Sequence, residues 1–289
     1  MTVLPRRPFL AALVVLLALG TGCARVYFGA VNAGVAAPEA AGLAYGPGPR
    51  HRVDVYRPTD ADGPAPVVVF FYGGRWKNGQ REDYRFVGEA FAERGMLAVI
   101  PDYRTWPEVG FPGFMEDAAA AVAWTHAHAR EHGGDPARLF LAGHSAGAHI
   151  AALLATDPRY LAAEGLDREA IAGVVGLAGP YDFLPTRDRD LLAIFGSDPE
   201  AQAESQPVNF VDAQAPPFLL VHGDADRLVI LRNSRRMAAR LEEAGVPVAL
   251  EVLPGVGHIR LLTGLRSESM APVLGAITGF VTSSGASSE

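Results

Sequence analysis

The fold is decided by the stretch Leu139-Phe140-Leu141-Ala142-Gly143-His144-Ser145-Ala146-Gly147-Ala148-His149-Ile150-Ala151-Ala152-Leu153-Leu154. An apolar run leads into the pentapeptide Gly-x-Ser-x-Gly, and a helix-compatible run follows it. This is the order of a nucleophile elbow, in which a strand enters, a sharp turn presents a serine and a helix begins beneath it. The flanking glycines fit, because the strand and the helix approach so closely that a β-carbon at either position would clash. Ser145 is therefore predicted to be a nucleophile.

A serine hydroxyl needs a base, an acid that orients the base, and donors for the developing oxyanion. On this scaffold the expected chain order is serine, acid, histidine. The strand-like run 217–221 ends in a loop that contains Asp224 and Asp226, and the strand-like run 248–253 leads into a glycine-rich turn that ends at His258. We therefore expect Asp226 to be the acid and His258 the base, with Asp224 as the rival acid.

The chain has eight histidines, and the other candidates for the base are weaker. His144 adjoins the nucleophile, at a point of the turn that is expected to face away from the serine. His149 follows Ser145 by one helical turn and is expected to be a packed, hydrogen-bonded residue. His222 ends a strand and is expected to support the acid loop. The histidines with charged neighbours on a probable helix are expected to be solvated: His126, His128 and His132.

The oxyanion donors are expected from the amide after the nucleophile, which belongs to Ala146, and from a loop after an earlier strand. The run 66–71 is a candidate core strand and leads into Tyr72-Gly73-Gly74-Arg75-Trp76-Lys77-Asn78-Gly79. Paired glycines allow backbone amides to turn toward a ligand without an intervening side chain. Trp76 could wall an acyl pocket. The candidate pocket residues are Tyr72, Gly73, Trp76 and His144.

These motifs together resemble α/β-hydrolases of the carboxylesterase group, which includes hormone-sensitive-lipase-like esterases, feruloyl-esterase-like enzymes and kynurenine formamidases. The resemblance spans roughly residues 51 to 283. The segments that carry it are Tyr72-Gly73-Gly74-Arg75-Trp76, Asp102-Tyr103-Arg104-Thr105-Trp106-Pro107-Glu108, the elbow, His222 to Asp226, and Gly257-His258. It implies that amides of Gly74 and Arg75 join that of Ala146 as donors. The chain departs from the family pattern by Tyr72 in place of histidine and Arg75 in place of a third glycine.

Length and composition agree with one large α/β domain. The chain has 289 residues, of which 49% are hydrophobic and 9% aromatic, enough for a substantial core. Alternation of strand-like and helix-compatible runs predicts a mostly parallel central sheet with helices on both faces. The strand-like runs are 52–56, 67–72, 96–101, 138–142, 173–178, 217–222 and 248–253, and the helix-compatible runs are 81–94, 113–132, 146–156, 231–244 and 267–281. The proline-rich stretch 180–216 breaks this alternation and is a candidate cap over the site.

The N-terminal segment has the three-part layout of an export signal. Arg6 and Arg7 precede an apolar run over residues 9–19, which is too short for a comfortable membrane span, and Cys23 follows. A small residue before a lone cysteine resembles a bacterial lipoprotein signal, which implies that Cys23 is lipidated, and the two arginines also resemble a twin-arginine export motif. The predicted organisation is a signal over 1–22, a tether over 23–50 that is rich in alanine, glycine and proline, and a catalytic domain over 51–284. The expected location is the cell envelope.

Charge and motif content exclude several partners. The segment 1–22 holds two of the 25 basic residues and none of the 32 acidic ones, so 23 basic residues remain and the mature chain carries about −9. This balance disfavours nucleic acid and anionic membrane surfaces as charge-driven partners. No metal cluster, phosphate loop or dinucleotide fingerprint is evident, so no cofactor is expected. The expected function is cofactor-independent hydrolysis of a small-molecule carboxylic ester. The alternatives are amide hydrolysis of the arylformamidase type and a non-catalytic envelope binding protein of the same fold.

Overall fold

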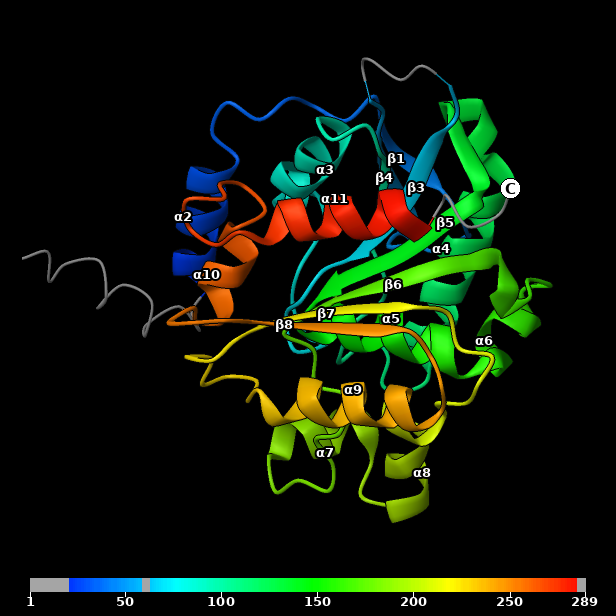
Figure 1. Cartoon of the computed structure of the whole chain (residues 1–289), viewed down its shortest axis with the longest axis vertical. Coiled ribbons are helices and arrows are strands. Elements are labelled where there is room, and N and C mark those ends of the chain that lie inside the picture. Colours follow the sequence, from blue (N-terminus) through cyan, green and yellow to red (C-terminus); the bar gives the residue numbers. More distant parts are fainter. Residues whose placement is uncertain (1–20, 59–62, 285–289) are drawn as a thin grey trace, which may run out of the picture.

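The computed structural model describes residues 21–58 and 63–284, which form an eight-stranded sheet between layers of helices (Figure 1). The sheet order is β1-β2-β4-β3-β5-β6-β7-β8. The pairs β1–β2 and β2–β4 are antiparallel, and every later pair is parallel. The strands are β1 (Ala40–Ala44), β2 (Arg52–Tyr56), β3 (Ala65–Phe71), β4 (Leu97–Pro101), β5 (Gly134–His144), β6 (Ile171–Leu177), β7 (Phe218–Gly223) and β8 (Val248–Leu253).

The central strands are buried on both faces, which explains their nearly continuous apolar sequences. In β3, six of seven residues are buried, and all five residues of β4 are buried. Helices cover both faces of a parallel sheet, so its strands need no polar side. The predicted α/β-hydrolase fold class, with a mostly parallel sheet and helices on both faces, is confirmed.

The helices divide between the two faces. Figure 1 shows α3 and α11 on one face and α5 and α9 on the other, and α4 contacts α5 and α6. The α-helices are α2 (Thr21–Val31), α3 (Arg85–Ala92), α4 (Gly113–His128), α5 (Ala146–Thr156), α6 (Pro158–Ala163), α7 (Arg189–Phe195), α8 (Pro199–Glu204), α9 (Arg232–Glu243), α10 (His258–Thr263) and α11 (Val273–Ser284). The short 3₁₀ helices are η1 (Arg81–Tyr84), η2 (Ala129–His132), η3 (Arg168–Ala170) and η4 (Pro207–Asn209).

The proline-rich stretch 180–216 is an insertion between β6 and β7. It contains α7, α8 and η4, and it lies beyond α5 and α9, outside the sheet (Figure 1). Asp188 and Asp198 cap α7 and α8 by accepting backbone N–H groups of their first turns. The insertion reaches the loop after β3, where Arg75 pairs with Asp188 at 2.8 Å and Lys77 with Asp190 at 2.9 Å.

The segment 23–50 differs from the expected tether. Its first residues belong to α2, which packs against the domain: the Tyr27 hydroxyl lies 2.8 Å from Thr263 Oγ1, and the ring of Phe28 lies 5.1 Å from that of Tyr84. Residues 40–44 form β1, an edge strand with a bulge at Gly42, whose φ is +65° and whose N–H donates to Asp54. The folded domain therefore begins well before residue 51. Of the predicted signal, residues 1–20 lie outside the described residues.

Within the described ranges, no helix combines the length and the apolarity needed to cross a bilayer.

Candidate active site

Ser145 stands at a strained turn between β5 and α5. Its φ of 57° and ψ of −120° are unusual for a residue with a β-carbon, and this conformation presents the side chain at the strand end. A β-carbon on Gly143 would overlap the backbone of Gly147, and one on Gly147 would overlap the carbonyl of Phe71. Both glycines are therefore required by the close crossing of strand and helix, as the sequence predicts. Ser145 is partly exposed, whereas its neighbours in the turn are buried.

The two other predicted members of the triad are in contact. His258 begins α10, and its Nδ1 lies 2.6 Å from Asp226 Oδ2. The other carboxylate oxygen of Asp226 accepts the N–H groups of Leu228 at 2.8 Å and Val229 at 3.0 Å. Burial alone would raise the pKa of Asp226, but the contacts with His222 Nε2, at 3.5 Å, and with His258 outweigh it and hold this pKa well below its usual value. The carboxylate is therefore ionised and can fix the tautomer of His258.

Asp224, the rival acid, has a different role. Its carboxylate accepts the N–H of Gly255 at 2.7 Å, and its own N–H donates to Leu253 O at 3.1 Å. These bonds join the loop after β7 to the turn after β8, in which the base lies. Of the two candidates, Asp226 is therefore the acid that contacts His258.

His222 supports the acid loop, as expected. Its ring is fully buried, with Nε2 2.8 Å from the carbonyl of Val229 and Nδ1 2.7 Å from Ser234 Oγ. Since a carbonyl only accepts, Nε2 carries the proton and Nδ1 accepts the hydroxyl proton. His222 thereby fixes the loop that delivers Asp226.

His144 lies against the base. Its Nε2 is 3.2 Å from the carbonyl of His258, and the two rings are 4.5 Å apart. Burial, and then the nearby His258, hold the pKa of His144 well below its usual value. His144 is almost fully buried against the turn that carries His258, and its role as a pocket residue stays a prediction.

The loop after β3 passes directly beside the nucleophile. A β-carbon on Gly73 would lie 3.1 Å from Ser145 Cβ, so Gly73 adjoins Ser145, and its role in a substrate pocket stays a prediction. Gly74 has a φ of +133°, and a β-carbon there would overlap the carbonyl of Asn78. Within the part of the chain that the structure describes, the amides of Gly74 and Arg75 have no hydrogen-bond acceptor. Ala146 is the first residue of α5, where amides lack partners within the helix.

Tyr72 supports this loop and does not line a pocket. Its ring is fully buried and stacks between Tyr84 at 5.3 Å and Tyr103 at 4.6 Å. Its hydroxyl donates to Asp102 Oδ1 at 3.0 Å. The prediction of Tyr72 as a pocket residue is not supported, because the side chain is fully buried between these partners.

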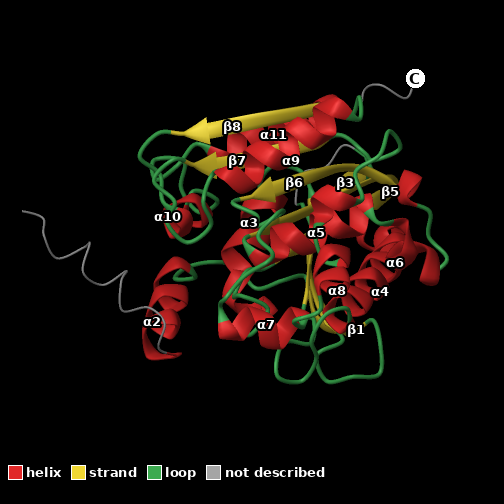
Figure 2. Ribbon diagram, turned by 90° about the horizontal axis from the view of Figure 1, so that it is seen from below, coloured by secondary structure: helices red, strands yellow, loops and turns green. Residues whose placement is uncertain are grey.

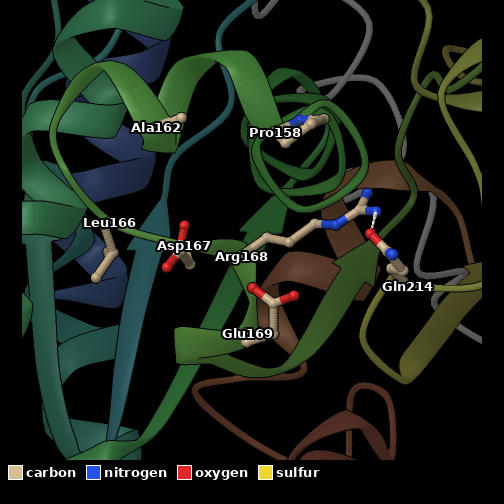
Figure 3. A pocket seen from close by; sticks show the side chains of 7 residues that line it. All are labelled: Pro158, Ala162, Leu166, Asp167, Arg168, Glu169 and Gln214. Carbon is tan, nitrogen blue, oxygen red and sulfur yellow. Dashed lines mark hydrogen bonds between the residues drawn. The ribbon is translucent and has the colours of Figure 1, made fainter.

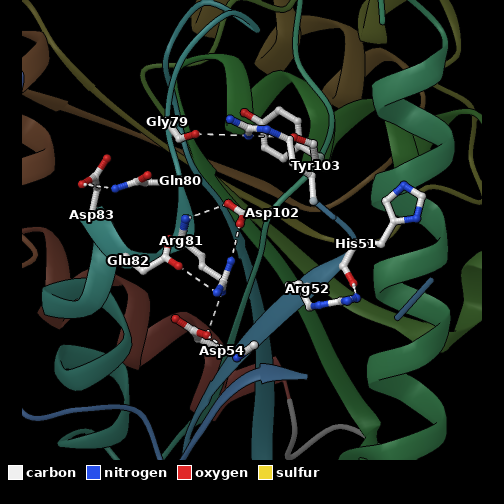
Figure 4. A network of polar contacts seen from close by, with 12 residues as sticks. His51, Arg52, Asp54, Gly79, Gln80, Arg81, Glu82, Asp83, Asp102 and Tyr103 are labelled. Carbon is white, nitrogen blue, oxygen red and sulfur yellow. Dashed lines mark hydrogen bonds and ion pairs between the residues drawn. The ribbon is translucent and has the colours of Figure 1, made fainter. Parts of the chain in front are cut away.

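Asp102 belongs to a polar network that ties the loop to the sheet (Figure 4). Arg81 lies between Asp54 and Asp102, with its Nε 2.8 Å from Asp54 and its Nη1 on Asp102. The guanidinium of Arg50 adds weaker bonds to Gly79 O at 3.3 Å and to Tyr103 O at 3.2 Å. The sequence gives Asp102 only as a family motif, and nothing in its spacing predicts this pairing with Arg81.

Trp76 joins the loop to the insertion. It is almost fully buried, and its ring lies 5.5 Å from Phe183 and 4.8 Å from Phe195. His149 also contacts this cluster, with its ring 5.0 Å from that of Trp76 and its Nε2 2.7 Å from Ser205 O. His149 is a packed, hydrogen-bonded residue, as expected. Trp76 packs against the insertion, and its role as the wall of an acyl pocket stays a prediction.

Two surface hollows lie away from the nucleophile. The smaller one, of about 190 Å³, surrounds Arg168, whose guanidinium is bonded to Gln214 (Figure 3). The same guanidinium also donates to Thr156 O and to Asp212. The larger one, of about 510 Å³, lies between α4, α6 and the insertion, with Phe195 in its wall. Among the described residues there is no group of His, Cys, Asp and Glu that could hold a metal ion.

The chain is similar to curated esterases. It is 35% identical to esterase LipC of Mycobacterium tuberculosis over 78% of this chain and 61% of LipC. It is 31% identical to a probable isoprenylcysteine α-carbonyl methylesterase of Arabidopsis thaliana over 76% of this chain and 50% of that protein. The chain thus spans between half and three fifths of the length of these relatives.

Solved structures share the fold. Thermogutta terrifontis esterase 2 is 26% identical, with a TM-score of 0.73 over 86% of this chain and 96% of that one. Esterase B from Lactobacillus rhamnosis has a TM-score of 0.79 over 95% of this chain and 97% of that one, and at 19% identity it is evidence for the fold alone. The family model BD-FAE matches residues 53–241, a range that begins within β2, ends within α9 and includes the elbow and Asp226. The chain belongs to the BD-FAE family of α/β-hydrolases.

Proposed function

We propose that the protein hydrolyses carboxylic esters through an acyl-enzyme intermediate. Ser145 Oγ attacks the ester carbonyl while His258 takes its proton and later returns it to the leaving alcohol. Asp226 holds the imidazole, and water repeats the cycle on the acyl-enzyme. The amides of Gly74, Arg75 and Ala146 stabilise the tetrahedral oxyanion.

The observation that carries this proposal is the 2.6 Å contact between His258 Nδ1 and Asp226 Oδ2 at the ends of β7 and β8, next to the elbow after β5. A binding protein gains nothing from an ionised, fully buried carboxylate that orients a histidine. The relatives are named as esterases, which favours an ester over a formamide as substrate.

The direct test removes the nucleophile. Ser145→Ala is expected to lower kcat on a simple aryl ester by a factor on the order of 10⁶, with unchanged thermal unfolding. A fluorophosphonate should label the parent at Ser145 and leave the variant unlabelled. Substantial activity in the variant, or no label on the parent, would contradict the proposal.

The substrate class requires a second measurement. The parent should be assayed on esters of graded acyl length and on arylformamides. Hydrolysis of arylformamides alone would establish the amide alternative, and hydrolysis of neither, with no label on Ser145, would establish the non-catalytic one.

We also propose that the protein is exported and lipidated on Cys23. The support is the arrangement of Arg6-Arg7, the apolar run 9–19 and the lone cysteine. Intact-mass analysis of the membrane fraction of a suitable bacterium should find a mature chain that begins with a lipid-bearing Cys23, and Cys23→Ser should abolish that species. A mature chain with another first residue, or an unmodified Cys23, would overturn the anchor and leave the hydrolase proposal intact.

A further inference from the structure

Exposed hydrophobic side chains gather at one end of the molecule. Among the described residues, five large hydrophobic side chains are more than about a third exposed, and Leu228 at 73% and Val26 at 72% lead them. The segments that carry them all lie where the parallel strands end: Val26 on α2, Leu228 and Ile230 in the loop after β7, Val252 at the end of β8, and Met270 between α10 and α11. Figures 1 and 2 both show these segments at the end to which the strand arrows point.

The loop after β7 and the first turn of α9 also carry unpaired positive charge. Arg227, Arg232 and Arg235 are exposed, and none of them has a salt bridge among the described residues. By contrast, the next arginine of α9, Arg236, pairs with Asp182. Within residues 224–235 the one exposed acid is Asp224, whose carboxylate already accepts the N–H of Gly255. This local surface is basic although the chain as a whole is acidic.

The first described helix, α2, lies at the same end of the molecule. Cys23, the proposed lipidation site, and Val26 both belong to α2. α2 is fixed to α10 by the bond between Tyr27 and Thr263. An anchor that holds the N-terminal segment in a bilayer would therefore also hold this end of the domain close to the bilayer surface.

We propose that this end of the molecule docks on the surface of a bilayer that contains anionic phospholipids. A surface that combines protruding apolar side chains with unpaired arginines is the kind that binds anionic lipid headgroups and the underlying acyl region. We define the docking surface as Val26, Arg227, Leu228, Ile230, Arg232 and Arg235. The proposal does not depend on lipid at Cys23, nor on the proposed ester hydrolysis.

Docking would place the reaction site at the lipid surface. Ser145, Asp226 and His258 follow β5, β7 and β8, so they lie at the strand ends that carry the docking surface. An ester that partitions into the bilayer would then reach the site without crossing bulk water.

The test follows the depth of a probe in the full chain. Cys23→Ser removes the sole cysteine, so that Leu228→Cys or Ile230→Cys provides a unique site for a polarity-sensitive fluorophore. The matched control is Glu164→Cys, which is exposed just after α6, at the opposite end of the sheet. Each chain is reconstituted into phosphatidylcholine vesicles with and without phosphatidylglycerol.

We expect the fluorescence emission of the probe at 228 or 230 to shift to shorter wavelength when vesicles are present. Lipid-borne quenchers should quench this emission, most strongly in vesicles that contain phosphatidylglycerol. The probe at 164 should show neither effect, because it remains in water. Arg227→Gln, Arg232→Gln and Arg235→Gln should each lower the docked-to-undocked ratio roughly fivefold. Arg130→Gln, an exposed arginine at the opposite end, should not change it.

Two outcomes would overturn the proposal. Equal access of an aqueous quencher to positions 228 and 164 in anionic vesicles would show that this end faces water. Shielding of position 228 in the absence of vesicles, rising with protein concentration, would show that a second copy of the chain covers the surface instead.

Discussion

The two halves of the site are held in different ways. On one side, Asp226 and His258 are fixed by short contacts between two neighbouring loops, with the two histidines His144 and His222 behind them. On the other side, the loop of residues 72–79 is fixed largely by buried aromatic packing, since Tyr72 stacks between Tyr84 and Tyr103 and Trp76 packs against Phe183 of the insertion. The acid–histidine side therefore depends on hydrogen bonds between neighbouring loops, whereas the oxyanion side depends on the packing of the core and the insertion.

This difference predicts how substitutions in each half of the site should affect activity and stability. A substitution on the acid–histidine side should alter chemistry with little effect on stability. A substitution on the oxyanion side should affect both, because the residues that place the amides are also core residues.

The largest effect is expected at the acid. Asp226→Asn should lower kcat by roughly 10⁴, because the amide stabilises the wrong tautomer of His258. Asp224→Asn, the matched control in the same loop, should be mild, since it disturbs only the bond to Gly255. Steady-state kinetics of both variants decide the point, and a reversal of the two penalties would make Asp224 the catalytic acid.

The next effect concerns the oxyanion loop. Gly74→Ala should lower kcat by about 10² to 10³, the usual cost of one lost oxyanion donor, because the new methyl group collides with the carbonyl of Asn78 and displaces the loop. Gly95→Ala is the control, since Gly95 also has a positive φ but open space around it. It should lower stability without changing kcat. Equal kcat in both variants would contradict the assignment of the oxyanion donors.

A third prediction concerns His149, which joins α5 to the insertion. Burial lowers its pKa to about 4 from the ordinary 6.5, so the folded state resists its protonation. Its contribution to stability is complete above about pH 6.5 and is lost as the pH falls toward 4, by about 3 kcal/mol in total. His149→Gln should therefore flatten the dependence of Tm on pH across this window, with a remainder from His144, whose pKa is also lowered. An unchanged dependence of Tm on pH in His149→Gln would contradict this prediction.

The smallest effect is expected at Tyr72. Tyr72→Phe removes the hydrogen bond to Asp102 and should cost about 1 kcal/mol in the free energy of unfolding, together with a few-fold loss in kcat. Tyr160→Phe is the control, because its hydroxyl has no hydrogen-bond partner among the described residues. Chemical denaturation of both variants measures the difference. A loss of stability with unchanged kcat would show that Tyr72 supports the fold without positioning the loop.

Much of the fold follows from the sequence, because the sheet interior has a clear pattern. Seven predicted strands are present within a few residues, and α5 coincides with its predicted range of 146–156. β1 was not predicted, since Ala40-Ala41-Gly42-Leu43-Ala44 has neither β-branched nor aromatic residues and owes its conformation to pairing with β2. The sequence pattern also does not predict α10, because a helix of six residues is too short to show the helical period in its apolar residues.

The site, like the fold, could be predicted from the sequence only in part. The contact between Asp226 and His258 could be predicted because the chain order of the fold limits the choice. The support by Asp102 and Arg81 could not, since ion pairs between distant segments leave no periodic signal. The catalytic domain is also longer than the predicted range 51–284. A chain that begins at residue 51 would lack β1 and Tyr45, whose hydroxyl donates to the carbonyl of Asp102.

The bulge in β1 has a consequence for the behaviour of the protein at high concentration. An edge strand offers unpaired N–H and C=O groups to other chains, and short or bulged edges discourage such pairing. β1 is protected in this way, because its bulge turns the Gly42 N–H inward to Asp54. The opposite edge, β8, is regular over six residues, and the exposed Glu251 is its one charge. Aggregation by strand addition is therefore expected to begin at β8, with Glu251 as its principal barrier.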